Sequence, residues 1–121
     1  MTQVTHAQHR AATPSAVVVE AFAVAVARVD HAALHGLLTD DVRWRQVGRR
    51  PVVGKDAVLK VLDRYGPATS LTIHHIVSDG CSGAVDGEVE LGRHRAFCHV
   101  VEFDDDGARV KAFTTYLVAD G

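Results

Sequence analysis

The chain has 121 residues, of which 47% are hydrophobic and 23% charged, a composition typical of one folded domain rather than of a disordered chain. Its net charge of -2 provides no general attraction to nucleic acids or to acidic membrane surfaces, so we expect neither as a partner. The cysteines, Cys81 and Cys98, are too few for a disulfide framework and lack the spacing of zinc ligands, which predicts buried thiols in a cytoplasmic protein. Residues 1–12 are polar and aperiodic, so we expect a disordered or loosely ordered arm before a single domain at 13–121.

The first predicted element is a buried helix. Thr13 followed by Pro14 is typical of a helix N-terminus, and the helix should run to about Val29. Most of its circumference is apolar, but Glu20, Arg28 and the short length of the segment argue against a membrane span or a signal peptide. Other elements must therefore cover this helix.

A second, short helix is predicted from Asp30, a helix-capping residue, to Leu38, and the acidic pair at 40–41 should close it. Residues 42–47 then alternate between apolar and charged side chains with period two. This pattern predicts a half-buried strand whose even-numbered side chains face inward, while its two arginines face outward.

The rest of the chain changes from helical to strand periodicity. After a loop at 48–54, a third helix is expected over 55–65, where Gly66 and Pro67 end it. Four β-rich runs separated by turn residues predict an antiparallel meander over 69–78, 81–91, 94–104 and 109–119. The sequence therefore predicts an α+β fold in which about three helices cover one curved antiparallel sheet.

The third strand of this meander carries apolar side chains on both faces. Phe97 and Val101 lie on one face, opposite Cys98 and Val100 on the other, and the last strand shows the same pattern. One face meets the helices, whereas the other needs a different cover, because exposed apolar patches of that size are uncommon on monomers. We therefore expect a homodimer formed through the convex face of the sheet.

Two histidine pairs resemble metal sites but favour structural roles. His31 and His35 have the i, i+4 spacing of helical metal ligands, yet no third ligand is evident, so we expect no metal and no cofactor. His74 and His75 point to opposite faces of a strand and cannot share a metal; one could line the pocket, but solvent exposure or core packing is the simpler interpretation. A basic cluster likewise favours a solvated face over an anion site: Arg43, Arg45, Arg49, Arg50 and Lys55.

The order helix, helix, strand, helix and four-stranded meander resembles the nuclear transport factor 2-like superfamily, specifically its SnoaL-like members, over residues 14–119. The stretches that carry the resemblance are the opening helix, LLTDDVRWRQVG, GKDAVLKVLDRY and FCHVVEFDDDGARVKAFTTYLV. The resemblance implies a cone-shaped half barrel, closed by the helices, with a pocket at its wide end. Similar proteins include isomerases, dehydratases, epoxide hydrolases, polyketide cyclases and non-catalytic binding modules, so the fold does not fix the function.

In similar ketosteroid isomerases, a carboxylate on the first strand is the base, and an acid on a later strand helps to bind the oxyanion. Matching LTDDVRWRQ and FCHVVEF to those motifs puts Gln46 at the base position and His99 at the position of the oxyanion acid. Glutamine cannot abstract a proton, so steroid isomerisation in its familiar form is not expected. His99 is instead the candidate catalytic acid or base, because alternation directs it into the pocket, where an imidazole would titrate near neutrality.

We therefore expect a small-molecule-binding protein with an apolar pocket, which could act as an isomerase, dehydratase, cyclase or hydrolase on a small apolar substrate. The expected ligand-binding residues are Phe22, Trp44, Gln46, Leu62, Phe97, Val101, Phe113 and Thr115. The alternative is a non-catalytic dimeric association module whose own side chains fill the pocket. An open cavity with His99 and Gln46 at its wall would favour ligand binding, whereas a collapsed interior in which both side chains are internally paired would favour the alternative.

Overall fold

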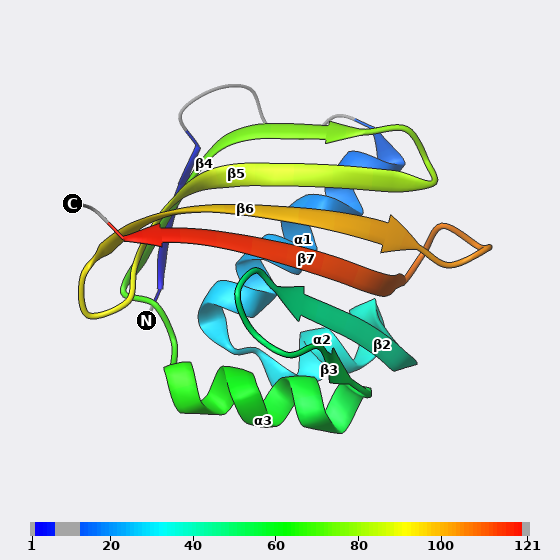
Figure 1. The fold of residues 1–121 in the computed structure, drawn as a ribbon. Coiled ribbons are helices and arrows are strands. Elements are labelled where there is room, and N and C mark those ends of the chain that lie inside the picture. The colour runs from blue at the N-terminus through cyan, green and yellow to red at the C-terminus, as the bar shows by residue number, and fades with distance from the viewer. Residues whose placement is uncertain (1, 7–12, 120–121) are drawn as a thin grey trace.

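The computed structural model describes residues 2–6 and 13–119, which form helices packed on one face of a seven-stranded sheet (Figure 1). In chain order the elements are β1 (Gln3–His6), α1 (Pro14–Arg28), α2 (His31–Leu37), β2 (Leu38–Gln46), β3 (Val52–Val53), α3 (Lys55–Tyr65), β4 (Ser70–Ser78), β5 (Ser82–Glu90), β6 (His94–Phe103) and β7 (Val110–Ala119). The α+β class and the three helices are as predicted.

Helix α1 begins where its capping residue predicts. The hydroxyl of Thr13 accepts a hydrogen bond from the backbone N–H of Ala16 at 3.2 Å, and Pro14 occupies the first turn, where its missing N–H costs no hydrogen bond. Val19 and Phe22 are fully buried against the sheet. Within the described part of the chain, no helix is both long and apolar enough to cross a membrane.

Helix α2 passes directly into β2. The carboxylate of Asp30 caps α2 by accepting a hydrogen bond from the N–H of Ala33 at 3.2 Å, as predicted. The strand, however, already begins at Leu38, so the acidic pair at 40–41 lies inside β2 rather than closing the helix. The pairing of β2 with β7 shifts its register between Leu38 and Arg43, which accommodates this irregular start.

The sheet is mixed rather than wholly antiparallel. Its strand order is β1-β4-β5-β6-β7-β2-β3, and β4 to β7 form the predicted antiparallel meander. Two further pairings are parallel, those of β1 with β4 and of β2 with β7. Both join segments that are far apart in sequence, so the local alternation of side chains does not reveal their direction. The pairing of β2 with β7 brings the first half of the chain into the meander.

The N-terminal segment also differs from expectation where it is described. Gln3–His6 forms the edge strand β1, and the hydroxyl of Thr2 donates a hydrogen bond to the carbonyl of Ala68 at 2.6 Å. His6 lies 2.8 Å from a carboxylate oxygen of Glu20 on α1. The remainder of the arm, residues 7–12, lies outside the described residues, as do residues 1 and 120–121.

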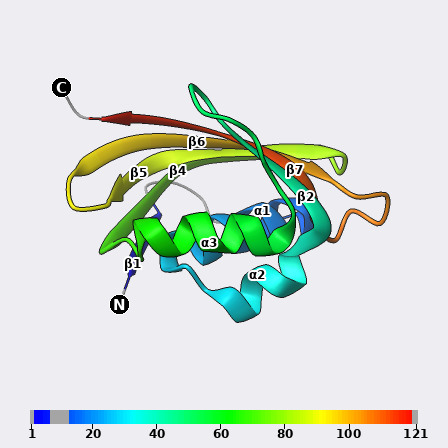
Figure 2. The same ribbon diagram turned by 60° about the horizontal axis from the view of Figure 1, so that its bottom comes forward.

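The three helices lie on one side of the curved sheet, whose other face is open (Figure 2). Two inner-face glycines of β5 permit close approach: a Cβ atom at Gly83 would lie 2.7 Å from Cγ2 of Val19, and one at Gly87 would collide with the backbone of Thr72. The register of β4 shifts just after Ile73, and such a bulge bends a strand. The sheet thus closes tightly under α1.

The two cysteines are not the buried thiols that composition predicts. Cys81 is exposed in the turn between β4 and β5, and Cys98 is half-buried on the open face of β6. Burial raises the pKa of the Cys98 thiol, with a smaller contribution from the charge of Asp86. Cys81 is exposed because it lies in a turn, and the position of Cys98 follows from strand parity, since it alternates with the inward-facing Phe97 and His99.

A candidate ligand-binding site

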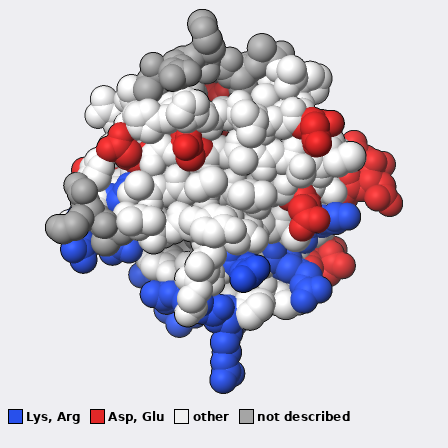
Figure 3. Space-filling model, turned by 45° about the horizontal axis from the view of Figure 1, so that its top comes forward, with Lys and Arg blue, Asp and Glu red and all other residues white. Residues whose placement is uncertain are grey.

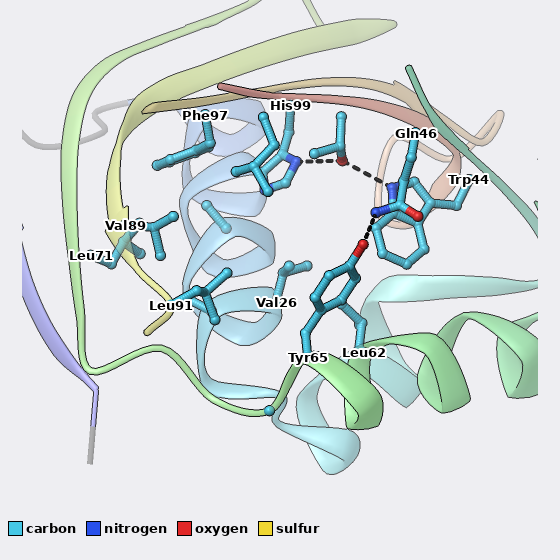
Figure 4. A pocket seen from close by; sticks show the side chains of 15 residues that line it. Val26, Trp44, Gln46, Leu62, Tyr65, Leu71, Val89, Leu91, Phe97 and His99 are labelled. Atoms are coloured by element: carbon cyan, nitrogen blue, oxygen red, sulfur yellow. Dashed lines mark hydrogen bonds between the residues drawn. The ribbon is translucent and has the colours of Figure 1, made fainter. Parts of the chain in front are cut away.

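A cavity of about 70 Å³ lies between the inner face of the sheet and the helices α1 and α3 (Figure 4). Of the residues expected at a ligand site, those that line it are Trp44, Gln46, Leu62, Phe97, His99 and Thr115. The other lining residues, which the sequence did not single out as ligand-binding, are Ala23, Val26, Ala27, Tyr65, Gly66, Leu71, Val89, Leu91 and Leu117. No carboxylate is among the lining residues.

Three side chains of the cavity wall form a hydrogen-bonded relay. The indole Nε1 of Trp44 donates to the hydroxyl oxygen of Thr115 at 2.9 Å, and the same oxygen lies 2.8 Å from Nδ1 of His99. An indole N–H can only donate, and the Thr115 oxygen could accept from both rings. The hydroxyl proton of Thr115 has no other acceptor among the described residues, however, so it is used only when it donates to Nδ1 of His99. This arrangement, which satisfies all three side chains, makes Nδ1 the acceptor and puts the ring proton on Nε2, for which no hydrogen bond to a described residue is found.

The surroundings of His99 keep its ring neutral. The side chain is only 7% exposed, and its ring packs against Phe97 at 5.1 Å and against Phe22 at 5.6 Å between ring centroids. Burial lowers the pKa of His99 to about 4, because the charged form loses its hydration. The expected titration near neutrality is therefore wrong. At neutral pH His99 is a hydrogen-bond donor through Nε2, not a proton carrier.

A second polar pair closes the side of the cavity next to α3. The amide nitrogen of Gln46 donates to the phenolic oxygen of Tyr65 at 2.8 Å, so Gln46 is internally paired (Figure 4). The hydroxyl proton of Tyr65, a half-buried lining residue, remains available to a ligand. Sequence reasoning missed Tyr65, although it continues the buried stripe of Val58 and Leu62 at helical spacing.

The sequence model of the SnoaL-like domain matches residues 19–121. The chain belongs to this family. Comparison with curated proteins finds no match. Among solved structures, this SnoaL-like chain is similar to an LEH-like epoxide hydrolase from M. tuberculosis (25% identity, 85% of this chain and 81% of that chain covered, TM-score 0.69). It is also similar to a steroid delta-isomerase from Pseudomonas aeruginosa (23%, 87% and 80%, TM-score 0.69) and to an NTF-2 like protein of unknown function from Burkholderia xenovorans LB400 (18%, 86% and 84%, TM-score 0.73). These likenesses confirm the predicted fold.

Three residues expected at the ligand site of this SnoaL-like domain belong to its core instead. Phe22 and Val101 are fully buried, Phe113 is 2% exposed, and none of them lines the cavity. Phe113 stacks on Trp44 with ring centroids 5.2 Å apart and meets Phe22 edge to face at 4.8 Å. Their strand and helix faces are as predicted, but they lie deeper than the cavity. Phe22 packs against the His99 ring and Phe113 against the Trp44 ring, on the side of the relay that faces the core.

The other histidines of the described residues do not line the cavity. His31 pairs with Asp63 at 2.7 Å between α2 and α3, while His74 and His75 pair with Glu88 and Asp86 of β5. Among the described residues, no group of three or more histidine, cysteine or acidic side chains is arranged to hold a metal ion. These histidines are therefore paired with carboxylates and are not directed at the cavity.

Proposed function

We propose that this SnoaL-like protein binds a small, largely apolar molecule that carries an oxygen acceptor, and that His99 donates a hydrogen bond to that oxygen. The observation that carries the proposal is the hydrogen bonding of Trp44 and His99 to the hydroxyl of Thr115, which favours a proton on His99 Nε2, an atom that bonds to no described residue. A donor prepared in this way, inside an apolar cavity, is the usual means of orienting a carbonyl, hydroxyl or epoxide oxygen.

The chemistry that this arrangement favours is polarisation of the bound oxygen. A neutral imidazole whose pKa is lowered to about 4 does not supply a proton at neutral pH, but it stabilises negative charge that develops on an acceptor. Isomerisation, dehydration and epoxide hydrolysis all develop such charge. The names of the similar epoxide hydrolase and steroid delta-isomerase agree with this range of substrates. In our proposal His99 is thus the catalytic electrophile.

The cavity limits the size of the part of the ligand that is enclosed. A volume of about 70 Å³ is below that of most drug-sized ligand sites, so a larger molecule extends through the mouth. Leu117 is 37% exposed, and Tyr65 and Leu91 are half-buried, so the mouth runs between α3 and the ends of β5 and β7. This opening supports ligand binding over the alternative in which the protein's own side chains fill the pocket.

We also propose that the protein is a homodimer. On the open sheet face, Val100, Tyr116 and Val118 are between 40% and 63% exposed. Figure 3 looks onto this face and shows a broad uncharged area with acidic side chains scattered over its upper part and right-hand side and basic ones mainly below it. A two-fold axis that lies in the plane of such a patch, at right angles to the direction from its acidic to its basic side, would place the acidic side of one copy against the basic side of the other. Both copies keep their cavities free.

The test uses two probes of equal size that differ in one oxygen. Trp44 is the only tryptophan, so its indole N–H gives one resonance that reports directly on the cavity wall. Cyclohexanone should shift this resonance and bind at least fivefold more tightly than methylcyclohexane, because only the ketone accepts from His99. The variant H99F should abolish that preference while V118F, on the open face, preserves it. A Trp44 resonance that neither probe moves would refute the proposal.

A further inference from the structure

Arg95 is a cation on the inner face of the sheet that no described residue neutralises. It is the second residue of β6, it has the same strand parity as Phe97 and His99, and it is half-buried. Its Nε atom is buried without a hydrogen-bond partner, and within the described ranges no carboxylate pairs with its guanidinium. An unsatisfied buried donor on a charged group is costly, so an acceptor from elsewhere would be favoured there.

The register places Arg95 at the border of the cavity. Val89 is its cross-strand partner, Phe97 lies two residues further along the same face, and Leu117 is the partner of Phe97 on β7. All three line the cavity. Neighbours of this kind have Cβ atoms roughly 5–8 Å apart, which is within reach of an arginine side chain. Arg95 is not itself a lining residue, but it lies directly next to three of them, beyond the cavity wall on the side away from the relay.

Among the described residues, the acidic side chains of the adjacent end of β5 are on the other face of the sheet and already have partners. Glu88 lies 2.7 Å from His74 and 2.6 Å from His94, and Glu90 lies 3.0 Å from His94. Neither carboxylate is directed to the inner face, because even-numbered residues of β5 alternate with the inward-facing Val85 and Val89. The positive charge at the cavity border is thus left for a ligand.

We propose that the ligand of the cavity is a carboxylate: an apolar acid whose two carboxylate oxygens accept hydrogen bonds from Nε and one Nη of Arg95. This inference rests on the proposed function and names its substrate class. The side edge of a guanidinium offers two parallel N–H donors that match a carboxylate. His99 lies four residues further along β6, roughly 13 Å away by strand rise. A ligand that uses both groups is therefore an elongated acid with its second oxygen far from the carboxylate.

The experiment compares octanoate with octan-1-ol, which share a chain and differ in charge. Binding is followed through the Trp44 indole resonance of the full chain at neutral pH. We expect octanoate to bind about ten- to a hundredfold more tightly than octan-1-ol, in line with one bidentate charge-assisted contact. R95M should remove that preference and leave octan-1-ol binding unchanged. R93M is the matched control, since it removes an exposed arginine two residues away and should keep the preference.

The outcomes separate this inference from the function on which it rests. Equal affinity of the wild type for both probes, or a preference that survives in R95M, overturns the role of Arg95 while the cavity remains a binding site. A Trp44 resonance that neither octanoate, octan-1-ol nor cyclohexanone moves overturns both. If R95M does not fold, the salt dependence of binding to the wild type is measured instead. Added NaCl should weaken the binding of octanoate but not that of octan-1-ol. Equal effects of NaCl on both probes would contradict the proposal.

Discussion

The hydroxyl of Thr115 lies 2.8 Å from Nδ1 of His99 and also accepts the indole proton of Trp44. This one oxygen joins β2, β6 and β7, because Trp44 and Thr115 come from strands that are parallel neighbours and His99 is the antiparallel partner of Thr115. The register of three strands therefore decides which nitrogen of the imidazole carries the proton. Without the parallel pairing of β2 with β7, the relay could not form.

Thr115→Val should destabilise the protein and weaken binding of an oxygen-containing probe. The change keeps the shape but leaves the Trp44 N–H and His99 Nδ1 without partners, which should lower the free energy of unfolding by about 2–4 kcal/mol. Urea denaturation measures this. Thr114→Val, one residue away on the opposite sheet face, is the control and should change the stability by less than about 0.5 kcal/mol. Similar small effects for both would contradict the relay.

The buried neutral state of His99 should make the fold sensitive to acid. Its pKa is lowered to about 4 in the folded protein from 6.5, so the unfolded chain binds the extra proton first as the pH falls. Its contribution to stability is therefore complete above pH 6.5 and is lost towards pH 4, by about 3 kcal/mol in all. His99→Gln should remove this part of the pH dependence in urea titrations between pH 7 and pH 4. An unchanged slope would refute it.

On the open face, His94 forms a cluster with Glu88, Glu90 and His74. The contribution of His94 to stability should depend on pH with the opposite sign to that of His99. Hydrogen bonding to Glu90 raises the pKa of His94, and hydrogen bonding to His74 lowers that of Glu88. The contribution of His94 is present below its ordinary pKa of 6.5 and is lost as the pH rises through the raised value. That of Glu88 is present above 4.5 and is lost as the pH falls.

Their combined contribution is therefore largest between pH 4.5 and 6.5. His94→Gln should flatten the fall in thermal stability between pH 6 and 9, measured by calorimetry. His35→Gln, at an exposed position on α2, should leave that fall as it is. If the two variants behave alike, the cluster does not contribute.

The open sheet face should hold two copies of the chain together in solution. Light scattering during gel filtration should give the mass of a dimer at micromolar concentration. Val100→Glu places a charge within the apolar patch of β6 and β7, and it should yield a folded monomer. Val53→Glu, at a similarly exposed position on β3, should remain dimeric. A wild type that is monomeric throughout would contradict the dimer.

The helix starts and the end of α3 could be predicted because local chemistry sets them, whereas the early start of β2 and the edge strand β1 could not. Thr13 and Asp30 cap their helices, Gly66 ends α3, and alternation correctly directs Trp44 and His99 inward. Strand direction at β2 was not predictable in the same way, since its parallel partner β7 is about seventy residues away. Capping and turn interactions act over a few residues, so they reveal where a helix begins or ends. They carry no information about the direction in which two distant strands pair.

The sequence predicts which side chains of the candidate site point to the inner face of the sheet, but not which of them reach the cavity. Alternation assigns Phe113 and Thr115 to the same side of β7, yet only Thr115 lines the cavity, because Phe113 lies further along the strand under Phe22. The lowered pKa of His99 could not be predicted from the sequence either, because it results from complete burial of the ring and not from charged residues nearby in the sequence. The packing of the helices on the curved sheet decides which inner-face side chains are covered and which line the cavity. The sequence of a single strand does not contain this information.

The tautomer of His99 tests the central claim most directly. A long-range nitrogen–proton NMR spectrum at pH 7 distinguishes a ring protonated on Nε2 from one protonated on Nδ1 and from an imidazolium. The relay predicts a neutral ring with its proton on Nε2, together with an acceptor-like shift for Nδ1. A proton on Nδ1, or a charged ring at that pH, would contradict the account.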